Sequence, residues 1–239
     1  MKKILNIAHR GYSSAFPENT MLAFDEAMKA GADGFECDLR LTSDGRVVVF
    51  HDDSLKRLCG VEGSIEKSTW QDLQNIRVKK KEKIPLLEEM LSTFLTTRIN
   101  LEIKASSRDA IVVENVLRVL TKVRPQGEII FSSFSLDALR SLQVMDGKRN
   151  LGRLGILVET KDLSHLEKIS NELKPDTWNL PKQVLKSPWG KRWSKENIRP
   201  IWTWTLDEPD EWTQVLKSKL PFEAIITNKP AALKSFLKS

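Results

Sequence analysis

Short apolar runs alternate with longer amphipathic segments along the whole chain. The short runs are rich in β-branched residues and predict strands. The predicted strands are Ile4–Ala8, Gly34–Asp38, Val47–Phe50, Ile99–Ile103, Ile129–Ser132, Leu154–Val158, Thr177–Leu180, Ile201–Trp204 and Ala224–Thr227. The longer segments repeat apolar positions with helical spacing. The predicted helices are Thr20–Ala30, Leu86–Thr96, Asp109–Lys122, Leu136–Val144, Leu163–Leu173, Pro209–Lys217 and Pro230–Lys238.

A strand–helix alternation over a whole chain indicates a parallel sheet covered by helices, the α/β class. About eight such units in 239 residues favour a closed TIM (β/α)₈ barrel, regular or distorted, and we expect residues 1–239 to form a single domain. Val47–Phe50 follows Gly34–Asp38 too closely for a helical crossover, and Ser43-Asp44-Gly45 between them is typical of a hairpin turn. One of this pair is therefore predicted to be a short extra strand near the barrel mouth.

Residues that favour helix ends mark several of the predicted helices. Asn19 can cap the first helix, and Asp207 and Asn228 each lie two positions before a proline. Proline is tolerated in a first helical turn, so both of these segments are typical of helix starts. Gly31 is predicted to follow the last turn of the first helix.

Composition and charge indicate a globular protein with an anionic partner. Apolar residues make up 40% of the chain and charged residues 29%, which are ordinary values for a chain that buries a full core. The net charge of +6 favours phosphorylated metabolites, phospholipid headgroups or nucleic acid as partners. We expect no nucleic-acid partner, because no binding motif accompanies the charge, and the run Lys79-Lys80-Lys81 is typical of a solvated loop.

The cysteines and the N-terminal segment favour a cytoplasmic protein without a transmembrane segment. Cys37 and Cys59 form neither a zinc spacing nor a disulfide framework, and Cys37 is expected to be a small buried hydrophobe. The apolar stretch after Met1 is broken by Asn6, far short of a signal peptide. No run approaches a membrane-spanning length. The sequence leaves the oligomeric state open.

Two of the three histidines directly follow predicted strands. His9 follows the first strand and is next to Arg10, and His51 follows the third and is next to Asp52. The carboxyl ends of the strands of a barrel face its active site, so both histidines are candidate site residues. His165 lies in a helical stretch and is assigned no role.

Acidic residues occur inside two predicted strands, where burying a carboxylate is costly unless it is paired or binds a metal. Glu36 and Asp38 are two positions apart and therefore point to the same side of one strand. Glu102 and Lys104 repeat this spacing on a later strand. Three carboxylates that converge at a barrel mouth make an all-oxygen site for one divalent cation, Mg²⁺ or Ca²⁺. The alternative is a set of salt bridges with Lys104 and Arg10.

The other charged residues near these positions complete a site for phosphodiester cleavage. Arg10 and Lys104 beside a cation suit a phosphate, the arginine as a fork and the lysine as a point charge. His9 and His51 could serve as general base and general acid near neutral pH. The sequence contains no nucleophile elbow, Walker A loop or dinucleotide fingerprint. The residues therefore predict metal-assisted phosphodiester hydrolysis.

Several short motifs follow one another in order along nearly the whole chain. They are His9-Arg10-Gly11, Glu18-Asn19-Thr20, Gly31-Ala32-Asp33-Gly34-Phe35-Glu36-Cys37-Asp38, Asp44-Gly45, Val48-Val49-Phe50-His51-Asp52, Ile84-Pro85-Leu86-Leu87-Glu88-Glu89, Leu101-Glu102-Ile103-Lys104, Ser132-Ser133-Phe134, Trp204-Thr205 and Ile225-Ile226-Thr227-Asn228-Lys229-Pro230. In this order and spacing they resemble the glycerophosphodiester phosphodiesterase family, in its bacterial cytoplasmic form. The resemblance implies an enzyme of lipid and glycerol metabolism that hydrolyses glycerophosphodiesters (deacylated phospholipids) to sn-glycerol 3-phosphate and an alcohol.

The resemblance also implies roles for individual residues. The implied metal ligands are Glu36, Asp38 and Glu102, the implied acid/base pair is His9 and His51, and the implied substrate-binding residues are Arg10, Lys104, Glu18 and Trp204. The first step implied is attack on phosphorus by the substrate's own glycerol hydroxyl, which gives a cyclic phosphate that water opens. That would explain why no protein nucleophile is apparent, because the hydroxyl is already next to the phosphate.

The chain departs from the family pattern at two positions, with Asn228 where the family usually has Asp and Asp207 where it usually has Asn. We expect little catalytic effect, because both residue types cap helices equally well. The segment Ser187–Trp193 interleaves tryptophan with basic residues. It is interpreted as a loop packed on the barrel in preference to a site for anionic lipid or nucleic acid.

Two other functions compete with diester hydrolysis. The same machinery could act on a lysophospholipid, as a lysophospholipase D, with Phe16, Trp189 and Trp193 lining a groove for the acyl chain. The chain could also be a non-catalytic barrel that binds phosphate or lipid headgroups. The complete set of two histidines and three carboxylates disfavours that reading, because a non-catalytic barrel has no physical need to keep them together.

Overall fold

The computed structural model of the protein describes residues 3–147, 150–159, 166–183 and 199–239. Within these residues, parallel strands close into a barrel because the first strand pairs with both the second and the last. The barrel strands are β1 (Leu5–His9), β2 (Gly34–Leu41), β6 (Arg98–Ile103), β7 (Ile129–Ser133), β8 (Arg153–Leu157), β9 (Thr177–Pro181), β10 (Ile201–Trp204) and β11 (Phe222–Thr227). This is the TIM-barrel architecture that the sequence predicts.

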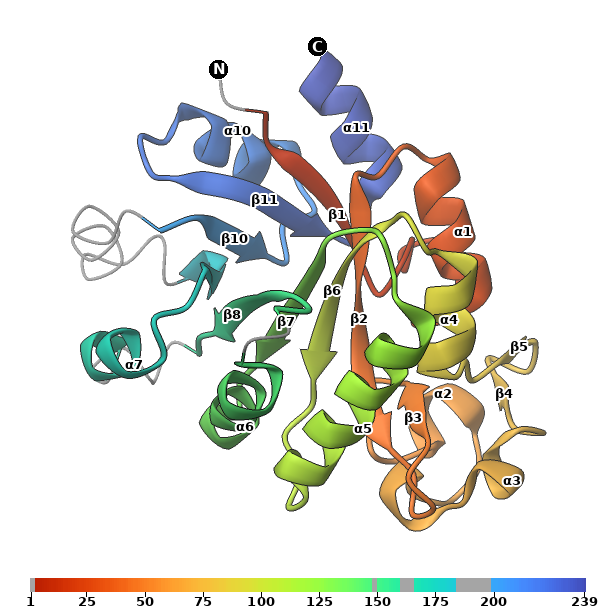
Figure 1. Ribbon diagram of the computed structural model, residues 1–239. Helices are drawn as coiled ribbons and strands as arrows, with labels where there is room; N and C mark the ends of the chain where they lie inside the picture. Colours follow the sequence, from red (N-terminus) through yellow and green to blue (C-terminus); the bar gives the residue numbers. More distant parts are fainter. Residues whose placement is uncertain (1–2, 148–149, 160–165, 184–198) are drawn as a thin grey trace.

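Helices surround the barrel on its outer face (Figure 1). They are α1 (Met21–Lys29), α4 (Leu87–Thr93), α5 (Asp109–Val123), α6 (Leu136–Asp146), α7 (Leu166–Leu173), α10 (Pro209–Lys217) and α11 (Pro230–Lys238). Each overlaps a predicted helix, although residues 163–165 of the predicted Leu163–Leu173 lie outside the described residues. The apolar faces of the helices pack on the outward side chains of the strands and form the largest hydrophobic cluster, which includes Phe24, Phe35 and Trp178.

The predicted extra strand is β3 (Val47–Val49), which pairs antiparallel with the end of β2. The register places Leu39 opposite Val49 and Leu41 opposite Val47. Gly45 adopts φ +80° in the turn between the two strands, a conformation that side chains disfavour. This hairpin extends β2 beyond the barrel and carries the chain toward His51.

Residues 50–86, hereafter the insert, form a small subdomain beside β3 (Figure 1). Its elements are α2 (Lys56–Cys59), a 3₁₀ turn at Ile65–Lys67, α3 (Trp70–Leu73), β4 (Arg77–Val78) and β5 (Glu82–Lys83). They enclose a separate apolar cluster built on Phe50, Leu55 and Ile65. The run Lys79-Lys80-Lys81 lies exposed at the turn between β4 and β5, as its charge predicts.

Two details of the sequence prediction concern burial and helix caps. Cys37 is fully buried in the main core, as expected of a small hydrophobe. The prediction that Asn19 caps α1 is wrong, because Thr20 is the N-cap and its hydroxyl accepts from the Ala23 N–H. Asp207 and Asn228 are not N-caps either, since Glu208 and Lys229 hold those positions. The side chains of Asn19, Asp207 and Asn228 instead make hydrogen bonds near the barrel mouth.

No helix among the described residues is long and apolar enough to cross a membrane.

The segment Ser187–Trp193, with Trp189 and Trp193, lies outside the described residues, as does His165. In Figure 1, β1 and β11 are neighbours in the barrel wall, and α11 follows β11.

Candidate active site

Three buried carboxylates converge at the carboxyl ends of β2 and β6. Glu36 and Asp38 alternate on β2, and the register of the two strands places Asp38 beside Glu102. One oxygen from each residue lies within 4.8 Å of the others. The alternation of side chains along a strand therefore brings together the three acids that the sequence singles out.

Electrostatics shows why these acids need a positive partner. Burial, and then repulsion from Asp38 and Glu102, raises the pKa of Glu36 well above its usual value. Burial, and then repulsion from Asp38, raises the pKa of Glu102 to about 7. Burial also works to raise the pKa of Asp38, but the charges of Arg10 and Lys104 hold it at about 2. Arg10 and Lys104 therefore keep Asp38 ionised, but they do not offset the cost of ionising Glu36 and Glu102 as well.

The donor set fits a hard divalent cation. Within the described residues, Glu36 Oε1 and Asp38 Oδ1 have no hydrogen-bond partner although both are buried. Lys104 Nζ lies 3.4 Å from Asp38 Oδ1, which is an ion-pair distance. A buried carboxylate oxygen without a partner is costly unless a ligand completes it. Carboxylate oxygens of this kind are the ligands that Mg²⁺ and Ca²⁺ prefer.

Arg10 lies directly after β1 and contacts Glu36 and Asp38 of the cluster and Glu18 outside it. Its backbone N–H donates to Glu36 at 2.9 Å, its Nε lies 3.1 Å from Asp38, and its Nη1 donates to Glu18 at 2.9 Å. The next residue has φ +79°, and a Cβ at Gly11 would lie 2.6 Å from the Ala23 backbone. The turn that aims Arg10 into the site therefore requires glycine at that position.

Lys104 contacts Glu102 and the Asp38 oxygen Oδ1, whereas Arg10 contacts Asp38 Oδ2. Its Nζ donates to Glu102 Oε1 at 2.5 Å. Burial works to lower the pKa of Lys104, but Asp38 and Glu102 raise it, so the ammonium group stays charged. The carboxylates thus lie between two fixed cations, which is an arrangement that attracts a phosphate once a metal ion neutralises the acids.

His9 is the last residue of β1, and its two ring nitrogens face different partners. Nδ1 lies 2.7 Å from Asn228 Oδ1, and Nε2 lies 3.9 Å from Glu36 Oε2. Burial, and then the charge of Arg10, lowers the pKa of His9 to about 4. The ring is therefore neutral at pH 7 and can accept a proton.

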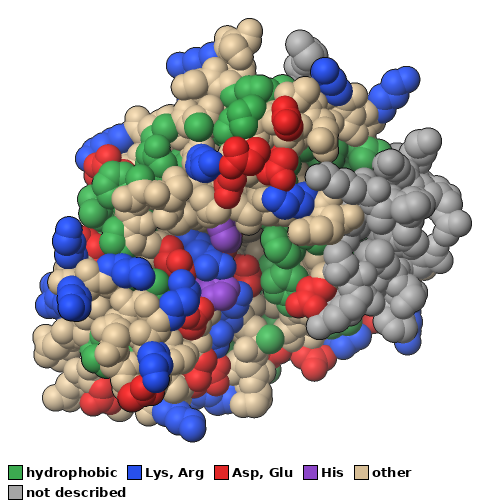
Figure 2. Space-filling view, turned by 180° about the vertical axis from the view of Figure 1, so that it is seen from behind, with side chains coloured by type: hydrophobic (Ala, Val, Ile, Leu, Met, Phe, Trp, Pro, Cys, Tyr) green, Lys and Arg blue, Asp and Glu red, His purple; other side chains and the backbone are tan. Residues whose placement is uncertain are grey.

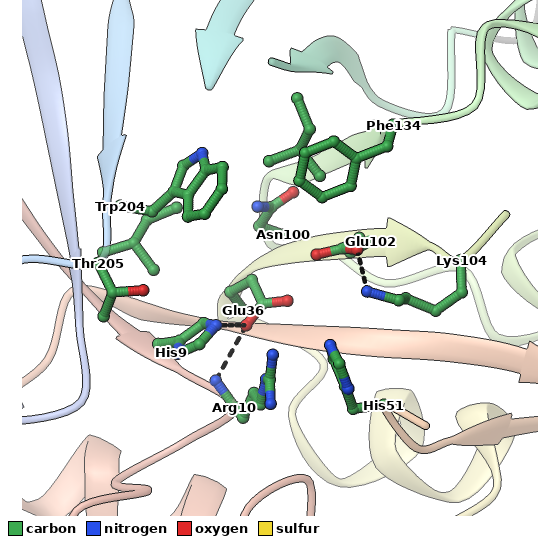
Figure 3. Close-up of a pocket in the computed structure, with 12 residues that line it drawn as sticks. His9, Arg10, Glu36, His51, Asn100, Glu102, Lys104, Phe134, Trp204 and Thr205 are labelled. Carbon is green, nitrogen blue, oxygen red and sulfur yellow. Dashed lines mark hydrogen bonds and ion pairs between the residues drawn. The ribbon is translucent and has the colours of Figure 1, made fainter. Parts of the chain in front are cut away.

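His51 faces the cluster from the hairpin side. Its Nδ1 lies 2.5 Å from Asp52 Oδ1, and partial burial lowers the pKa of its ring. Figure 3 places His9 and His51 on either side of Arg10 below Glu36 and Glu102. In Figure 2, both histidines are visible in one hollow surrounded by acidic and basic side chains. The structure therefore brings the two predicted histidines into one site.

The hollow continues into a cavity of about 230 Å³. Its apolar lining is Phe134, Leu157, Trp204 and Ile226, and its polar lining includes His9, Arg10, Glu36, His51, Glu102 and Lys104. Trp204 and Phe134 meet edge to face with ring centroids 5.7 Å apart, and the Trp204 indole donates to the Asn179 carbonyl at 3.0 Å. These contacts fix one wall of the cavity (Figure 3).

Glu18 occupies a different place from the other predicted substrate-binding residues. It does not line the cavity and instead contacts Arg10 and Arg57. Burial works to raise the pKa of Glu18, but hydrogen bonds from Arg57 and the charge of Arg10 lower it. Glu18 is therefore an ionised carboxylate that orients Arg10.

Several residues near the site were given no role in it by the sequence prediction. Asn19 makes two hydrogen bonds with Asp38, as donor to its carboxylate at 2.7 Å and as acceptor from its N–H at 3.3 Å. Asn100 and Phe134 line the cavity. The alternation rule could have found Asn100, two positions before Glu102, and Phe134 follows β7 directly. Arg57 lies on a short helix of the insert, for which the sequence gives no periodic signal.

A family model and similar proteins place this geometry in context. The chain matches the model of the glycerophosphoryl diester phosphodiesterase family over residues 9–232. A glycerophosphodiester phosphodiesterase of Caldanaerobacter subterraneus is 30% identical and is covered over 96% of its length by 97% of this chain. An uncharacterized protein of Bacillus subtilis, YqiK, is 38% identical, but the match spans 55% of this chain and 58% of that protein.

Solved structures show the same fold. A glycerophosphodiester phosphodiesterase from Thermotoga maritima has a TM-score of 0.78 and 28% identity, covering 98% of this chain and 99% of that one. An Oleispira antarctica phosphodiesterase, determined with the product sn-glycerol-3-phosphate, has a TM-score of 0.85 and 24% identity, covering 98% and 96%. The chain therefore belongs to the glycerophosphoryl diester phosphodiesterase family and is an enzyme that hydrolyses glycerophosphodiesters.

Proposed function

We propose that the protein cleaves glycerophosphodiesters to sn-glycerol 3-phosphate and an alcohol with a divalent cation held by Glu36, Asp38 and Glu102. The observation that carries this proposal is the buried cluster of three carboxylates between Arg10 and Lys104. When bound, Mg²⁺ or Ca²⁺ would neutralise the acids and stabilise negative charge that develops on the phosphate.

Arg10 and Lys104 bind the phosphate from opposite sides in this proposal. Their positions are fixed by the carboxylates that they contact, so little reorganisation is needed when substrate arrives. Glu18 keeps Arg10 in place from outside the cavity, and Trp204 forms the wall against which the organic part of the substrate packs. The apolar half of the cavity excludes water from that side.

His9 is proposed as the general base and His51 as the general acid. The hydrogen bond from Nδ1 to Asn228 leaves Nε2 as the acceptor that faces the cluster, and the lowered pKa keeps the ring neutral. His9 would take the proton of the attacking glycerol hydroxyl, which forms the new P–O bond of a cyclic phosphate. His51 would protonate the leaving alkoxide, and the roles reverse when water opens the ring.

The size of the cavity favours a diester without an acyl chain. A volume of about 230 Å³ suits a glycerophosphate and a small headgroup. A lysophospholipid would need a further groove, and Trp189 and Trp193, two of its proposed lining residues, lie outside the described residues. A cytoplasmic location stays a prediction, and fractionation of cells that express the chain would test it.

The test is release of glycerol 3-phosphate from glycerophosphocholine and glycerophosphoethanolamine with Mg²⁺, with Ca²⁺ and with EDTA. We expect release that EDTA abolishes and one of the two cations restores. H9A and H51A should each lose turnover while keeping the circular dichroism spectrum of the wild type. Normal turnover in either variant would contradict that histidine's role. Release of glycerol 3-phosphate that persists in EDTA after dialysis would contradict the proposed metal dependence.

A further inference from the structure

One arginine of the insert joins the two halves of the active-site mouth. Arg57, on α2, donates to Asp52 from Nε at 2.5 Å and from Nη2 at 3.0 Å. It also donates to Glu18 from Nη1 at 3.0 Å and from Nη2 at 2.8 Å. All three nitrogens of the guanidinium therefore contact carboxylates. Each carboxylate accepts two hydrogen bonds, and Nη2 donates to both carboxylates.

Each of these carboxylates contacts a residue of the site on its far side. Asp52 Oδ1 lies 2.5 Å from Nδ1 of His51, and Glu18 Oε1 accepts from Nη1 of Arg10. The chain of contacts therefore runs from His51 through Asp52, Arg57 and Glu18 to Arg10. It connects the hairpin side of the mouth to the loop after β1.

We propose that Arg57 is a positioning residue that sets the orientation of His51 and of Arg10 at the same time. The proposal rests on the proposed roles of His51 as an acid/base group and of Arg10 as a phosphate ligand. Arg57 does not line the cavity. It acts through Asp52 on the histidine ring and through Glu18 on the guanidinium of Arg10.

The planar fork of arginine explains why this residue type holds that place. Two carboxylates approach one guanidinium along different edges, and each receives two N–H groups in a fixed geometry. A lysine ammonium could contact both carboxylates but could not fix their rotation. Without Arg57, Asp52 would be free to leave Nδ1 of His51, and Glu18 would be free to rotate about Arg10.

A purely structural role, in which Arg57 fastens the insert to the barrel, does not account for these contacts. The insert is attached by an apolar cluster that includes Val48 of β3, by a bridge between Val48 and Leu86, and by backbone hydrogen bonds such as Phe50 N–H to the Asp38 carbonyl. Arg57 adds contacts only to the two carboxylates that contact site residues. Its side chain is 46% exposed, so it contributes little to the insert's core.

The test compares Arg57→Ala with Arg140→Ala, a matched control. Arg140 lies on α6, pairs with Asp137 and Glu172, and is 45% exposed, so it matches Arg57 in exposure and in pairing with two carboxylates but has no link to the site. We expect R57A to lower kcat and to raise KM. Together these changes should lower kcat/KM by about 10- to 100-fold, because a contact that supports a catalytic group is lost. R57K should recover only part of this loss, and R140A should stay within about twofold of wild type.

Double variants separate the two arms of the contact chain. In an Asp52→Asn background, R57A should no longer lower kcat, and in a Glu18→Gln background it should no longer raise KM. If Arg57 had only a structural role, R57A would lower the melting temperature in both backgrounds, and its effects on kcat and KM would not separate between them. R57A effects that are equally large in both backgrounds would overturn the proposal, as would R57A kinetics equal to those of R140A.

Calorimetric binding of sn-glycerol 3-phosphate with Mg²⁺ provides a readout that does not need turnover. R57A should bind this ligand more weakly than R140A, because Arg10 is no longer held. Equal affinity in the two variants would overturn the proposed action on Arg10. Wild-type protein that neither turns over diesters nor binds this ligand would overturn the proposed function, and this inference with it.

Discussion

Asn228 Oδ1 lies 2.7 Å from Nδ1 of His9, and the orientation of that amide is fixed by its other contacts. Asn228 Nδ2 donates to Asp207 Oδ2 at 2.7 Å, so its oxygen faces the histidine. The Ser13 hydroxyl donates to the same oxygen at 2.8 Å. His9 must therefore donate from Nδ1, which leaves Nε2 as the proton acceptor. Asn228, which the sequence analysis names as a departure from the family pattern, thus determines the tautomer of the proposed base.

Replacing Asn228 with Asp should shift the pH dependence of the reaction. A carboxylate beside Nδ1 stabilises the imidazolium form, so the pKa of His9 should rise from its lowered value. The acidic limb of the kcat/KM profile, below which His9 is protonated and inactive as a base, should move to higher pH. Initial rates of glycerophosphocholine hydrolysis across a pH series would measure this shift. An acidic limb in N228D that coincides with that of wild type would argue against His9 as the base.

A divalent cation should stabilise the fold through the three carboxylates. At about 100 times its Kd, a ligand of the native state adds about 2.7 kcal/mol, which raises Tm by about 5 to 10 °C in a chain of this size. Glu102→Gln should remove most of this increase. Glu128→Gln is a suitable control, because Glu128 pairs with Arg98 and Arg153 away from the cluster. Differential scanning fluorimetry with and without Mg²⁺ or Ca²⁺ checks this, and an equal shift in E102Q would remove Glu102 from the ligand set.

The contribution of Glu102 to the stability of the metal-free protein should fall as the pH rises from about 4.5 to 7. Glu102 keeps its proton in the folded state up to a pKa of about 7, whereas the unfolded chain releases it near the ordinary pKa of a glutamate, 4.5. The folded state then binds more protons, so stability falls with pH in this window, by roughly 3 kcal/mol from this group. Urea unfolding in EDTA at several pH values would show the slope. The lowered pKa of His9 acts in the opposite direction over part of this window, so the test is the difference between wild type and E102Q. The stability of E102Q relative to wild type should rise with pH, and parallel pH profiles would mean that Glu102 does not titrate there.

Trp204→Ala should weaken substrate binding more than catalysis. Loss of the indole removes one wall of the cavity and the edge contact with Phe134. We expect KM for glycerophosphocholine to rise about 10-fold, or about 1.4 kcal/mol, with a smaller change in kcat. Trp70→Ala provides a control, because Trp70 lies on α3 and does not line the cavity. A KM in W204A equal to that in W70A would exclude Trp204 from substrate binding.

The barrel and most of its site follow from local sequence signals. Each strand is a short apolar run whose two faces are both buried, so the run itself is visible without knowledge of its neighbours. The residues that follow such runs must lie at the barrel mouth, which is why His9 and Lys104 could be assigned to one site. The alternation rule placed Glu36 and Asp38 on one side of β2, and the strand register then brought Glu102 to them.

The remaining parts depend on contacts that no local pattern encodes. The insert folds through elements of two to four residues around a small cluster, too short for any periodicity to develop. Asn19 has the residue type of a helix cap, but its left-handed backbone, φ +57°, turns its amide toward Asp38. Arg57 reaches Glu18 across 39 positions of sequence. Such pairings become predictable only once the barrel has brought the segments together.

The pairing of β1 with β11 also sets when the site can exist. His9 ends β1, and its partner Asn228 follows β11, 219 positions later in the chain. A nascent chain on the ribosome, or a fragment cut before β11, contains the three acidic residues and both histidines. It lacks Asn228, whose Oδ1 accepts the hydrogen bond from Nδ1 of His9. We therefore expect hydrolytic activity to arise only with barrel closure, so that incomplete chains are inert toward cellular diesters.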